Sequence, residues 1–210
     1  MRLGTAIRSG LVGVLLAAAT LLPGCTHSPG TQPPPDGVLT LNIDPAPVAV
    51  SNLVLQSARM QIEKLTVIGD TVPDGRSMLA EIVVDLLAAA RSFSFGMLPQ
   101  GVYSRVTFRI DSIQMQGTWR GVPLQIQIDT GDTAGLVDLR SSSGVELSAG
   151  HDATLAVSVD TASWFAGDLL DTATQSSSQI VVDLNNNTAV GAELLARAVA
   201  SFALHDSPIP

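Results

Sequence analysis

Apolar and polar side chains alternate along most of the chain from Val38 onward. The clearest alternating stretches are 39–44, 102–111, 124–129 and 154–160, and further candidates lie at 53–56, 60–68, 79–86, 145–147 and 180–184. A strand of this kind buries one face and leaves the other in solvent, as is usual in antiparallel sheets. Within 102–111, the pattern places Val106 and Phe108 on the buried face. It places Tyr103 and Arg105 on the polar face, either solvated or in a cross-strand cation–π or ion pair.

Turn residues separate the predicted strands at short intervals. They are Pro73-Asp74-Gly75, Pro99-Gln100-Gly101, Gly121, Thr130-Gly131-Asp132 and Ser148-Ala149-Gly150. Many short strands with such turns predict an all-β fold: an antiparallel β-sandwich of two sheets, of the immunoglobulin-like or prealbumin-like type. One short C-terminal helix interrupts the pattern at 190–199, where Leu194, Leu195 and Ala198 recur at helical spacing, and a last strand follows near 201–204.

The chain opens with a positively charged segment and an apolar run. Arg2 and Arg8 precede Leu11–Leu22, a run shorter than the roughly 18 apolar residues that a membrane-spanning helix needs. This pattern is typical of a cleavable signal peptide, which we assign to residues 1–24. The run ends in Leu-Pro-Gly-Cys, which resembles the lipobox of bacterial lipoproteins and implies a covalent lipid on Cys25, the only cysteine of the chain.

The segment after Cys25 is a predicted tether. It contains three consecutive prolines among Ser, Gly, Gln and Thr, and therefore holds an extended, solvated conformation over 25–36. The folded domain is expected at 37–206, with a short tail at 207–210. Thr26 stands where an aspartate would resemble an inner-membrane retention signal, so we expect an outer-membrane lipoprotein of the cell envelope, facing the periplasm or the cell surface. Acyl chains then anchor the protein to the membrane.

Composition limits the partners of this domain. Apolar residues make up 46% of the chain, charged residues 14% and aromatic residues 4%, so the chain can bury a core but offers few rings for stacking on bases or sugars. Removal of Arg2 and Arg8 with the leader would change the formal net charge from −8 to −10. An acidic surface repels phosphate backbones, and we expect no nucleic-acid binding.

The sequence offers few catalytic candidates. It has no Gly-x-Ser-x-Gly elbow and no cysteine besides Cys25, while His151 and Asp152 are neighbours in a predicted turn and point apart. We therefore expect no catalytic residues and no cofactor beyond the lipid.

One weak metal candidate remains. Asp183, Asn185 and Asn187 match the start of a Ca²⁺ loop, but Thr188 stands in place of the turn glycine and Leu194 in place of the bidentate glutamate. The alternative is an Asn-rich turn held by its own hydrogen bonds.

Two aromatic motifs are candidates for surface contacts. Trp119 and Arg120 lie near a predicted hairpin tip, and an exposed Trp beside an Arg is typical of an interaction anchor. Alternatively, the ring folds back over the edge of the sheet. Trp164 and Phe165 follow a predicted strand and are expected to fill one end of the sandwich.

The order of these segments resembles an uncharacterised family of bacterial lipoprotein domains, catalogued as a domain of unknown function. The resemblance rests on Leu41…Asp44…Pro47, Val84-Asp85-Leu86-Leu87, Pro99-x-Gly101-x-Tyr103 and the Ala-Gly turn before 154–160. It spans the mature domain, implies a secreted β-sandwich and assigns no catalytic residue. We expect a non-catalytic module that binds an envelope protein or glycan or supports an envelope assembly; the alternative is a domain that binds a small ligand or Ca²⁺.

Overall fold

Two β-sheets make up most of the described part of the chain. The computed structural model describes residues 37–70, 76–131 and 134–206, all within one compact unit, Pro34–Pro210. The strands are β1 (Gly37–Pro45), β2 (Leu53–Gly69), β3 (Arg76–Asp85), β4 (Arg91–Leu98), β5 (Gly101–Trp119), β6 (Val122–Asp129), β7 (Leu136–Leu147), β8 (Ala153–Val159), β9 (Gln175–Ser176), β10 (Gln179–Val182) and β11 (Phe202–His205). The helices are the 3₁₀ helices η1 (Thr161–Phe165) and η2 (Leu169–Thr172) and the α-helix α1 (Thr188–Ala200). The predicted signal peptide, Cys25, the tether, the turn at 73–75, Asp132 and the tail lie outside the described residues.

The sheets contain parallel as well as antiparallel pairs. The small sheet has the order β11-β8-β1-β4, and the large sheet has the order β3-β2-β5-β6-β10-β9, with β7 also paired to β5. Most neighbours are antiparallel, as predicted, but β1 pairs with β8, and β6 with β10, in parallel. The predicted all-β sandwich of two sheets is therefore present, and the correction to the predicted antiparallel pairing concerns these two pairs of strands. Parallel pairs need long connections, and here residues 46–152 and 130–178 provide them.

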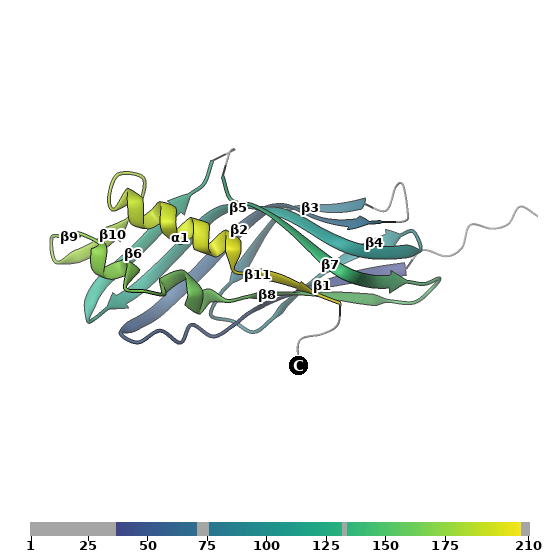
Figure 1. Ribbon diagram of the computed structural model, residues 1–210, viewed down its shortest axis with the longest axis horizontal. Helices are drawn as coiled ribbons and strands as arrows, with labels where there is room; N and C mark the ends of the chain where they lie inside the picture. The colour runs from purple at the N-terminus through teal and green to yellow at the C-terminus, as the bar shows by residue number, and fades with distance from the viewer. Residues whose placement is uncertain (1–36, 71–75, 132–133, 207–210) are drawn as a thin grey trace, which may run out of the picture. The chain divides into compact units, whose positions relative to one another are not determined.

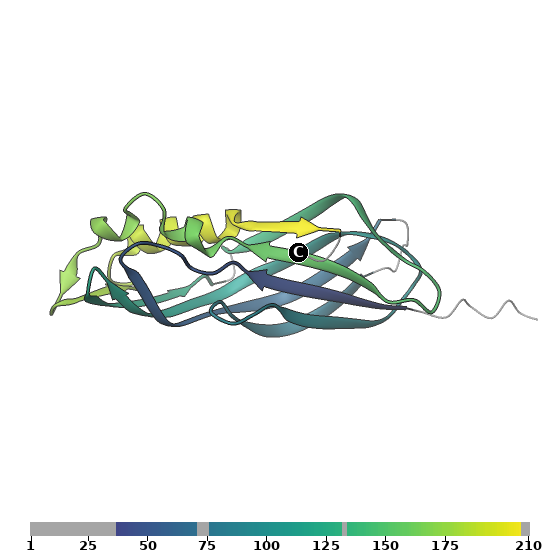
Figure 2. The ribbon, with the colours of Figure 1, turned by 90° about the horizontal axis from the view of Figure 1, so that it is seen from below.

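Strand β5 organises the large sheet. It pairs with β2 along one edge, and along its other edge first with β7 (101–109) and then with β6 (112–119). The small sheet covers the inner face at the β7 end, while α1 covers the β6 and β10 end (Figure 1, Figure 2). The rings of Phe108 on β5 and Phe202 on β11 meet edge to face with centroids 5.0 Å apart. The core is therefore continuous, and it is covered by the small sheet at one end of the large sheet and by α1 at the other.

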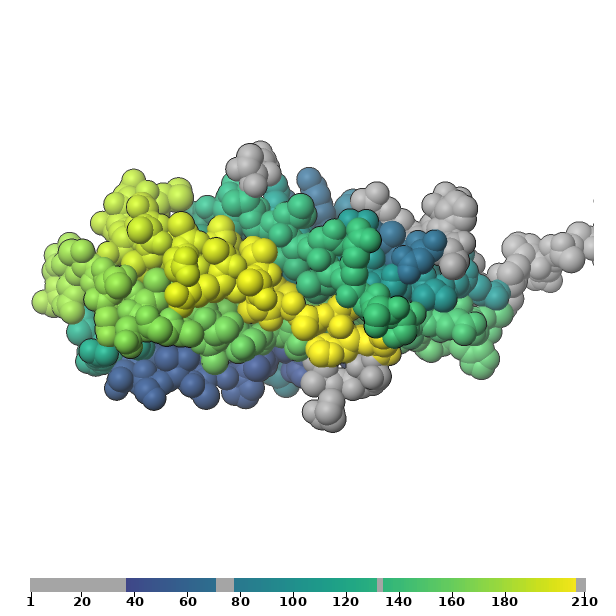
Figure 3. All heavy atoms as spheres, in the orientation of Figure 1, coloured from purple at the N-terminus to yellow at the C-terminus, as the bar shows by residue number. Residues whose placement is uncertain are grey.

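The helix binds the large sheet through a narrow apolar stripe. Val190, Leu194 and Ala198 are buried, and they recur at the spacing of one helix face. The other face of α1 is at the surface, where α1 and β11 form one continuous yellow strip (Figure 3). The helix predicted at 190–199 and the strand after it are thus confirmed. Among the residues that the structure describes, no helix has the length and hydropathy of a bilayer span.

β-Bulges change which residues face the core. In β2, Met60 and Ile62 are buried, but beyond Lys64, which has a φ of 54°, Leu65 and Val67 are buried instead. A second register shift, where β2 pairs with residues 110–112 of β5, moves the buried positions of β5 from even to odd numbers. An inserted residue exchanges the two faces of a strand. These shifts let one long sheet remain apolar inside and polar outside along its whole length.

Three features depart from the sequence predictions. The stretches 53–56 and 60–68 are one strand, β2, and β4 was not predicted, although Phe93 and Phe95 alternate with serines in it. Tyr103 is buried rather than on the polar face, because the β5–β7 pairing shifts register between Tyr103 and Arg105. Its hydroxyl donates a 2.8 Å hydrogen bond to the carbonyl of Pro99. Trp164 and Phe165 are buried in the core, as predicted.

Candidate functional site

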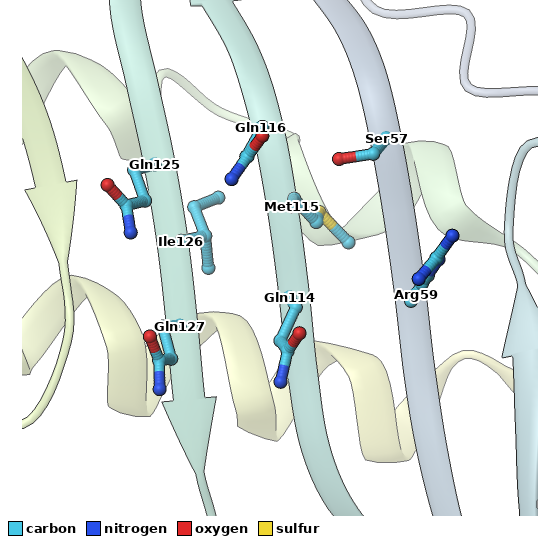
Figure 4. Close-up of a pocket in the computed structure, with 8 residues that line it drawn as sticks. All are labelled: Ser57, Arg59, Gln114, Met115, Gln116, Gln125, Ile126 and Gln127. Atoms are coloured by element: carbon cyan, nitrogen blue, oxygen red, sulfur yellow. The ribbon is translucent and has the colours of Figure 1, made fainter.

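An open pocket lies on the outer face of the large sheet, where β2, β5 and β6 run side by side. We call it the glutamine pocket; it has a volume of about 290 Å³. Its lining residues are Ser57, Arg59, Gln114, Met115, Gln116, Gln125, Ile126 and Gln127 (Figure 4). The close-up shows a helix behind the sheet, so the pocket and α1 lie on opposite faces of the sheet. Four of the eight lining residues are glutamines, and this sets the chemistry of the site.

Strand periodicity and register bring the glutamines together. In β5, Ile113 and Met115 are buried, which places Gln114 and Gln116 on the outer face. In β6, Leu124, Ile126 and Ile128 are buried. Gln125 and Gln127 alternate with them and therefore face outward in the same way.

The register across the three strands then forms two rows. Gln116 lies between Ser57 and Gln125, and Gln114 lies between Arg59 and Gln127. Directly opposed side chains on one face of a sheet are close enough to interact with a common ligand.

The amide groups of the pocket have free hydrogen-bonding capacity. Gln125 accepts a weak 3.4 Å hydrogen bond from Gln179, but within the described residues Gln114, Gln116 and Gln127 have no side-chain hydrogen bond to the protein. Each amide can donate two hydrogen bonds and accept two. The pocket therefore presents a dense array of donors and acceptors to solvent.

Arg59 is the one cation that lines this pocket, and it has no hydrogen-bond or ion-pair partner among the described residues. The described side chains of the other arginines hydrogen-bond or pair with carbonyl or carboxylate oxygens: Arg91, Arg105, Arg109, Arg120, Arg140 and Arg197. For Arg59, the described part of the chain provides no such contact, although Asp85 lies opposite it on β3. No carboxylate lines the pocket. The guanidinium is thus available to an anionic group of a ligand.

The rest of the same sheet face behaves differently. Toward the β7 end, Arg109 pairs with Glu63, and Arg105 binds Asp138 through two hydrogen bonds of 2.8 and 2.7 Å. The Arg105 hydrogen bond holds the pKa of Asp138 below its usual value. This pairing confirms the cross-strand ion pair that was one alternative for Arg105. In this region the charged side chains form ion pairs with one another. The charged side chain of the glutamine pocket, Arg59, forms no ion pair with the described residues.

A second pocket, of about 480 Å³, lies between the β1–β2 and β3–β4 connections. Its lining is Asp44, Pro45, Pro47, Val48, Leu55, Leu86, Leu87, Ala88, Ala89 and Ala90. Asp44 is its one charged side chain. Because apolar contacts carry little directional information, the glutamine pocket is the better candidate for specific recognition.

Trp119 and Arg120 lie at a hairpin tip, as predicted, but Trp119 is not an exposed anchor. Positive φ angles at Arg120 and Gly121 form the two-residue turn between β5 and β6. The indole is 6% exposed, and its Nε1 donates a 2.8 Å hydrogen bond to Asp171. Arg120 is exposed, pairs with the same carboxylate at 2.6 Å and stacks over the indole. The ring therefore folds back against η2, and only Arg120 faces solvent.

The calcium candidate forms a hydrogen-bonded turn. Oδ1 of Asp183 accepts hydrogen bonds of 2.7 Å from the backbone N–H groups of Asn185 and Asn186. The hydrogen bond from Asn185 is the main cause that lowers the pKa of Asp183. The amide of Asn187 donates to the carbonyls of Thr174 and Val181. In the described residues, no cluster of three His, Cys, Asp or Glu side chains has metal-binding geometry. The geometry favours the Asn-rich turn over a preformed ion site.

The two described histidines, and the serines near the end of β11, make local contacts. His151 is exposed in a turn, as predicted. His205 on β11 lies 2.9 Å from the hydroxyl of Ser158, but no described hydrogen bond orients its other ring nitrogen. The hydroxyls of Ser141 and Ser143 both donate to Asp206. These contacts join β11 to β8 and to β7.

The alternation at 124–129 predicts a polar strand face that carries Gln125 and Gln127, but it does not identify the site. The sequence feature that could have indicated the site is the same spacing of two glutamines, Gln114 and Gln116, in the preceding strand. Comparison with known proteins adds no further assignment: no family model, curated protein or solved structure matches this chain.

Proposed function

We propose that this chain is a non-catalytic binding module of the bacterial cell envelope, anchored by lipid at Cys25, and that the glutamine pocket contacts its partner. Within this proposal the sandwich is of the immunoglobulin-like or prealbumin-like type and belongs to the uncharacterised lipoprotein family that the sequence resembles. The observation that carries the proposal is the group of outward-facing amides with free hydrogen-bonding capacity beside Arg59, which has no ion-pair partner among the described residues.

The chemistry of the pocket supports binding rather than catalysis. Amide side chains do not gain or lose protons near neutral pH, so they cannot act as general acids or bases. Ser57 has no base among the lining residues. These groups hold a ligand through hydrogen bonds on a rigid sheet.

The anchor and the compartment rest on the leader. A lipid on the N-terminal cysteine and an extended tether would hold the domain close to the membrane while leaving the sheet face accessible. The partner would then be another envelope component, a protein or a glycan.

Site-specific photocrosslinking in intact cells tests this function. A photoreactive residue replaces Gln116 in the full-length protein, and in a matched variant it replaces Ser94, an exposed residue of β4 in the small sheet. We expect crosslinked envelope material, protein or glycan, from position 116 in excess of that from position 94. Equal or absent crosslinking at the two positions would show that the glutamine pocket is not the binding surface.

A further inference from the structure

The glutamine pocket lacks the features that other classes of macromolecule require. Protein interfaces rely on apolar or aromatic anchors in desolvated pockets, whereas Met115 and Ile126 in the pocket floor are about 1% exposed. Phosphate polymers need several cations, and the pocket has one, in a protein with a net charge of −8. Neither an apolar protein surface nor a nucleic acid is complementary to this site.

A hydroxyl-rich ligand matches the amide rows. Hydroxyl groups both donate and accept hydrogen bonds, as glutamine amides do, so a sugar can satisfy both kinds of group at once. Neighbouring strands are about 4.8 Å apart, and outward residues of one strand recur about every 6.8 Å. The two rows formed by Gln114 with Gln127 and by Gln116 with Gln125 therefore cover an area the size of one or two sugar units.

Arg59 adds a requirement for negative charge. It is exposed, it lies in the same row as Gln114, and no described carboxylate forms an ion pair with it, although Asp85 lies opposite it on β3. A planar guanidinium binds a carboxylate through two parallel hydrogen bonds. A single guanidinium among neutral amides suits a ligand with sparse charge, such as one carboxylate among many hydroxyls.

We propose that the glutamine pocket binds an acidic glycan, with Arg59 on a sugar carboxylate and Gln114, Gln116, Gln125 and Gln127 on hydroxyl groups. This inference rests on the proposed function, because it specifies the ligand of the same pocket. Recognition is by hydrogen bonding and one charge contact, without an aromatic platform.

Calorimetric titration of the full-length protein in detergent micelles tests the ligand class. The probes are a galactose oligomer in which one unit is galacturonic acid, which carries a single carboxylate, and the matched neutral oligomer of galactose. We expect the acidic oligomer to bind at least roughly tenfold more tightly than the neutral one, since a charge-assisted hydrogen bond is worth about that factor. Equal affinity for the two oligomers, or no binding of either, would overturn the glycan inference.

Variants separate the charge contact from the amide contacts. Arg59→Gln should remove the preference for the acidic oligomer, while Lys64→Gln, which removes an exposed charge of the same sheet, should not. Gln114→Ala with Gln127→Ala should weaken binding of both oligomers, whereas Gln56→Ala, an exposed glutamine outside the pocket, should leave it unchanged. An acidic preference that persists in Arg59→Gln would contradict the assignment.

The two proposals fail in different ways. Crosslinking of position 116 to a protein, without binding of the acidic oligomer, refutes the glycan inference and leaves the binding module intact. Absence of specific crosslinking at 116 together with absence of oligomer binding refutes both.

Discussion

The indole N–H of Trp119 donates a 2.8 Å hydrogen bond to the carboxylate of Asp171, 52 residues further along the chain. This contact ties the tip of the β5–β6 hairpin to η2, and it explains why an aromatic side chain at a hairpin tip is buried. Arg120 reaches the other oxygen of the same carboxylate. One aspartate therefore satisfies both residues that the sequence marked as an interaction candidate.

Removal of this carboxylate should destabilise the domain. We expect Asp171→Ala to lower the free energy of unfolding by about 1–3 kcal/mol, because the buried indole N–H loses its acceptor. Arg120→Gln removes an exposed ion pair and the contact of the guanidinium with the indole ring, and should cost no more than about 1 kcal/mol. Urea denaturation followed by tryptophan fluorescence measures both. A larger loss from Arg120→Gln than from Asp171→Ala would contradict this ranking.

Gly117 is required by close backbone packing beside the glutamine pocket. A Cβ atom at this position would lie 2.1 Å from the carbonyl oxygen of Val54, next to the register shift at Leu55–Ser57. We expect Gly117→Ala to cost more than about 2 kcal/mol, because backbone cannot move aside as a side-chain end can. Gly96→Ala on β4, where no atom lies within 4 Å of the added Cβ, is the control and should change stability by less than about 0.5 kcal/mol. Thermal unfolding of both variants tests the difference.

The sequence predicts the class of fold because alternation survives in most strands, but it does not predict their faces or partners. Lys64 and the shift near Ser112 exchange buried and exposed positions, and such bulges depend on the neighbouring strand rather than on local composition. The parallel pairing of β1 with β8 likewise joins segments more than one hundred residues apart, which no local pattern encodes.

The candidate site was missed for the same reason. Gln114 and Gln127 become neighbours only when β5 and β6 are in register. Trp119, in contrast, was identified correctly as a hairpin-tip residue, but its burial depends on Asp171, which lies in a segment that the pattern left unassigned. Local structure was predictable here, and long-range contacts were not.

The contact between β7 and the end of β11 should make stability sensitive to acid. The hydroxyls of Ser141 and Ser143 donate to Asp206 and hold its pKa below the ordinary value of 3.8. Because the unfolded chain keeps the ordinary pKa, this contact stabilises the fold fully above that value, and the stabilisation is lost as the pH falls through the lower, folded-state pKa.

A double variant isolates that effect. Ser141→Ala with Ser143→Ala should be less stable than the wild type at about pH 6. The difference should shrink at about pH 3, below the ordinary carboxyl pKa, because the unfolded chain is then protonated at Asp206 and the advantage of the lowered folded-state pKa is reduced. Ser142→Ala is the control, since Ser142 is exposed and makes no described hydrogen bond to Asp206. Urea midpoints at the two pH values give the measurement. A difference that does not depend on pH would exclude the role of Asp206.

The proposed lipidation at Cys25 predicts that loss of this cysteine moves the protein out of the membrane fraction. Cys25→Ser should move the protein from the membrane pellet to the soluble fraction and abolish incorporation of a labelled fatty acid, because two or more acyl chains are what gives stable anchoring. The wild-type protein, labelled and fractionated in parallel, is the control. If the variant still sediments with membranes, another segment provides the attachment.

The turn at Asp183 predicts a weak response to calcium. A Ca²⁺ ion needs six to eight oxygen ligands, but Oδ1 of Asp183 already accepts two backbone N–H groups, and Asn187 uses its amide on the backbone of β10 and residue 174. Calcium binding would have to break these hydrogen bonds of the turn. The free energy lost in breaking them opposes coordination of the ion. We expect about 1 mM Ca²⁺, the weak end of protein calcium sites, to shift the melting temperature no more than the same concentration of Mg²⁺ does. A rise specific to Ca²⁺ that disappears in Asp183→Ala would instead establish a calcium site at this turn.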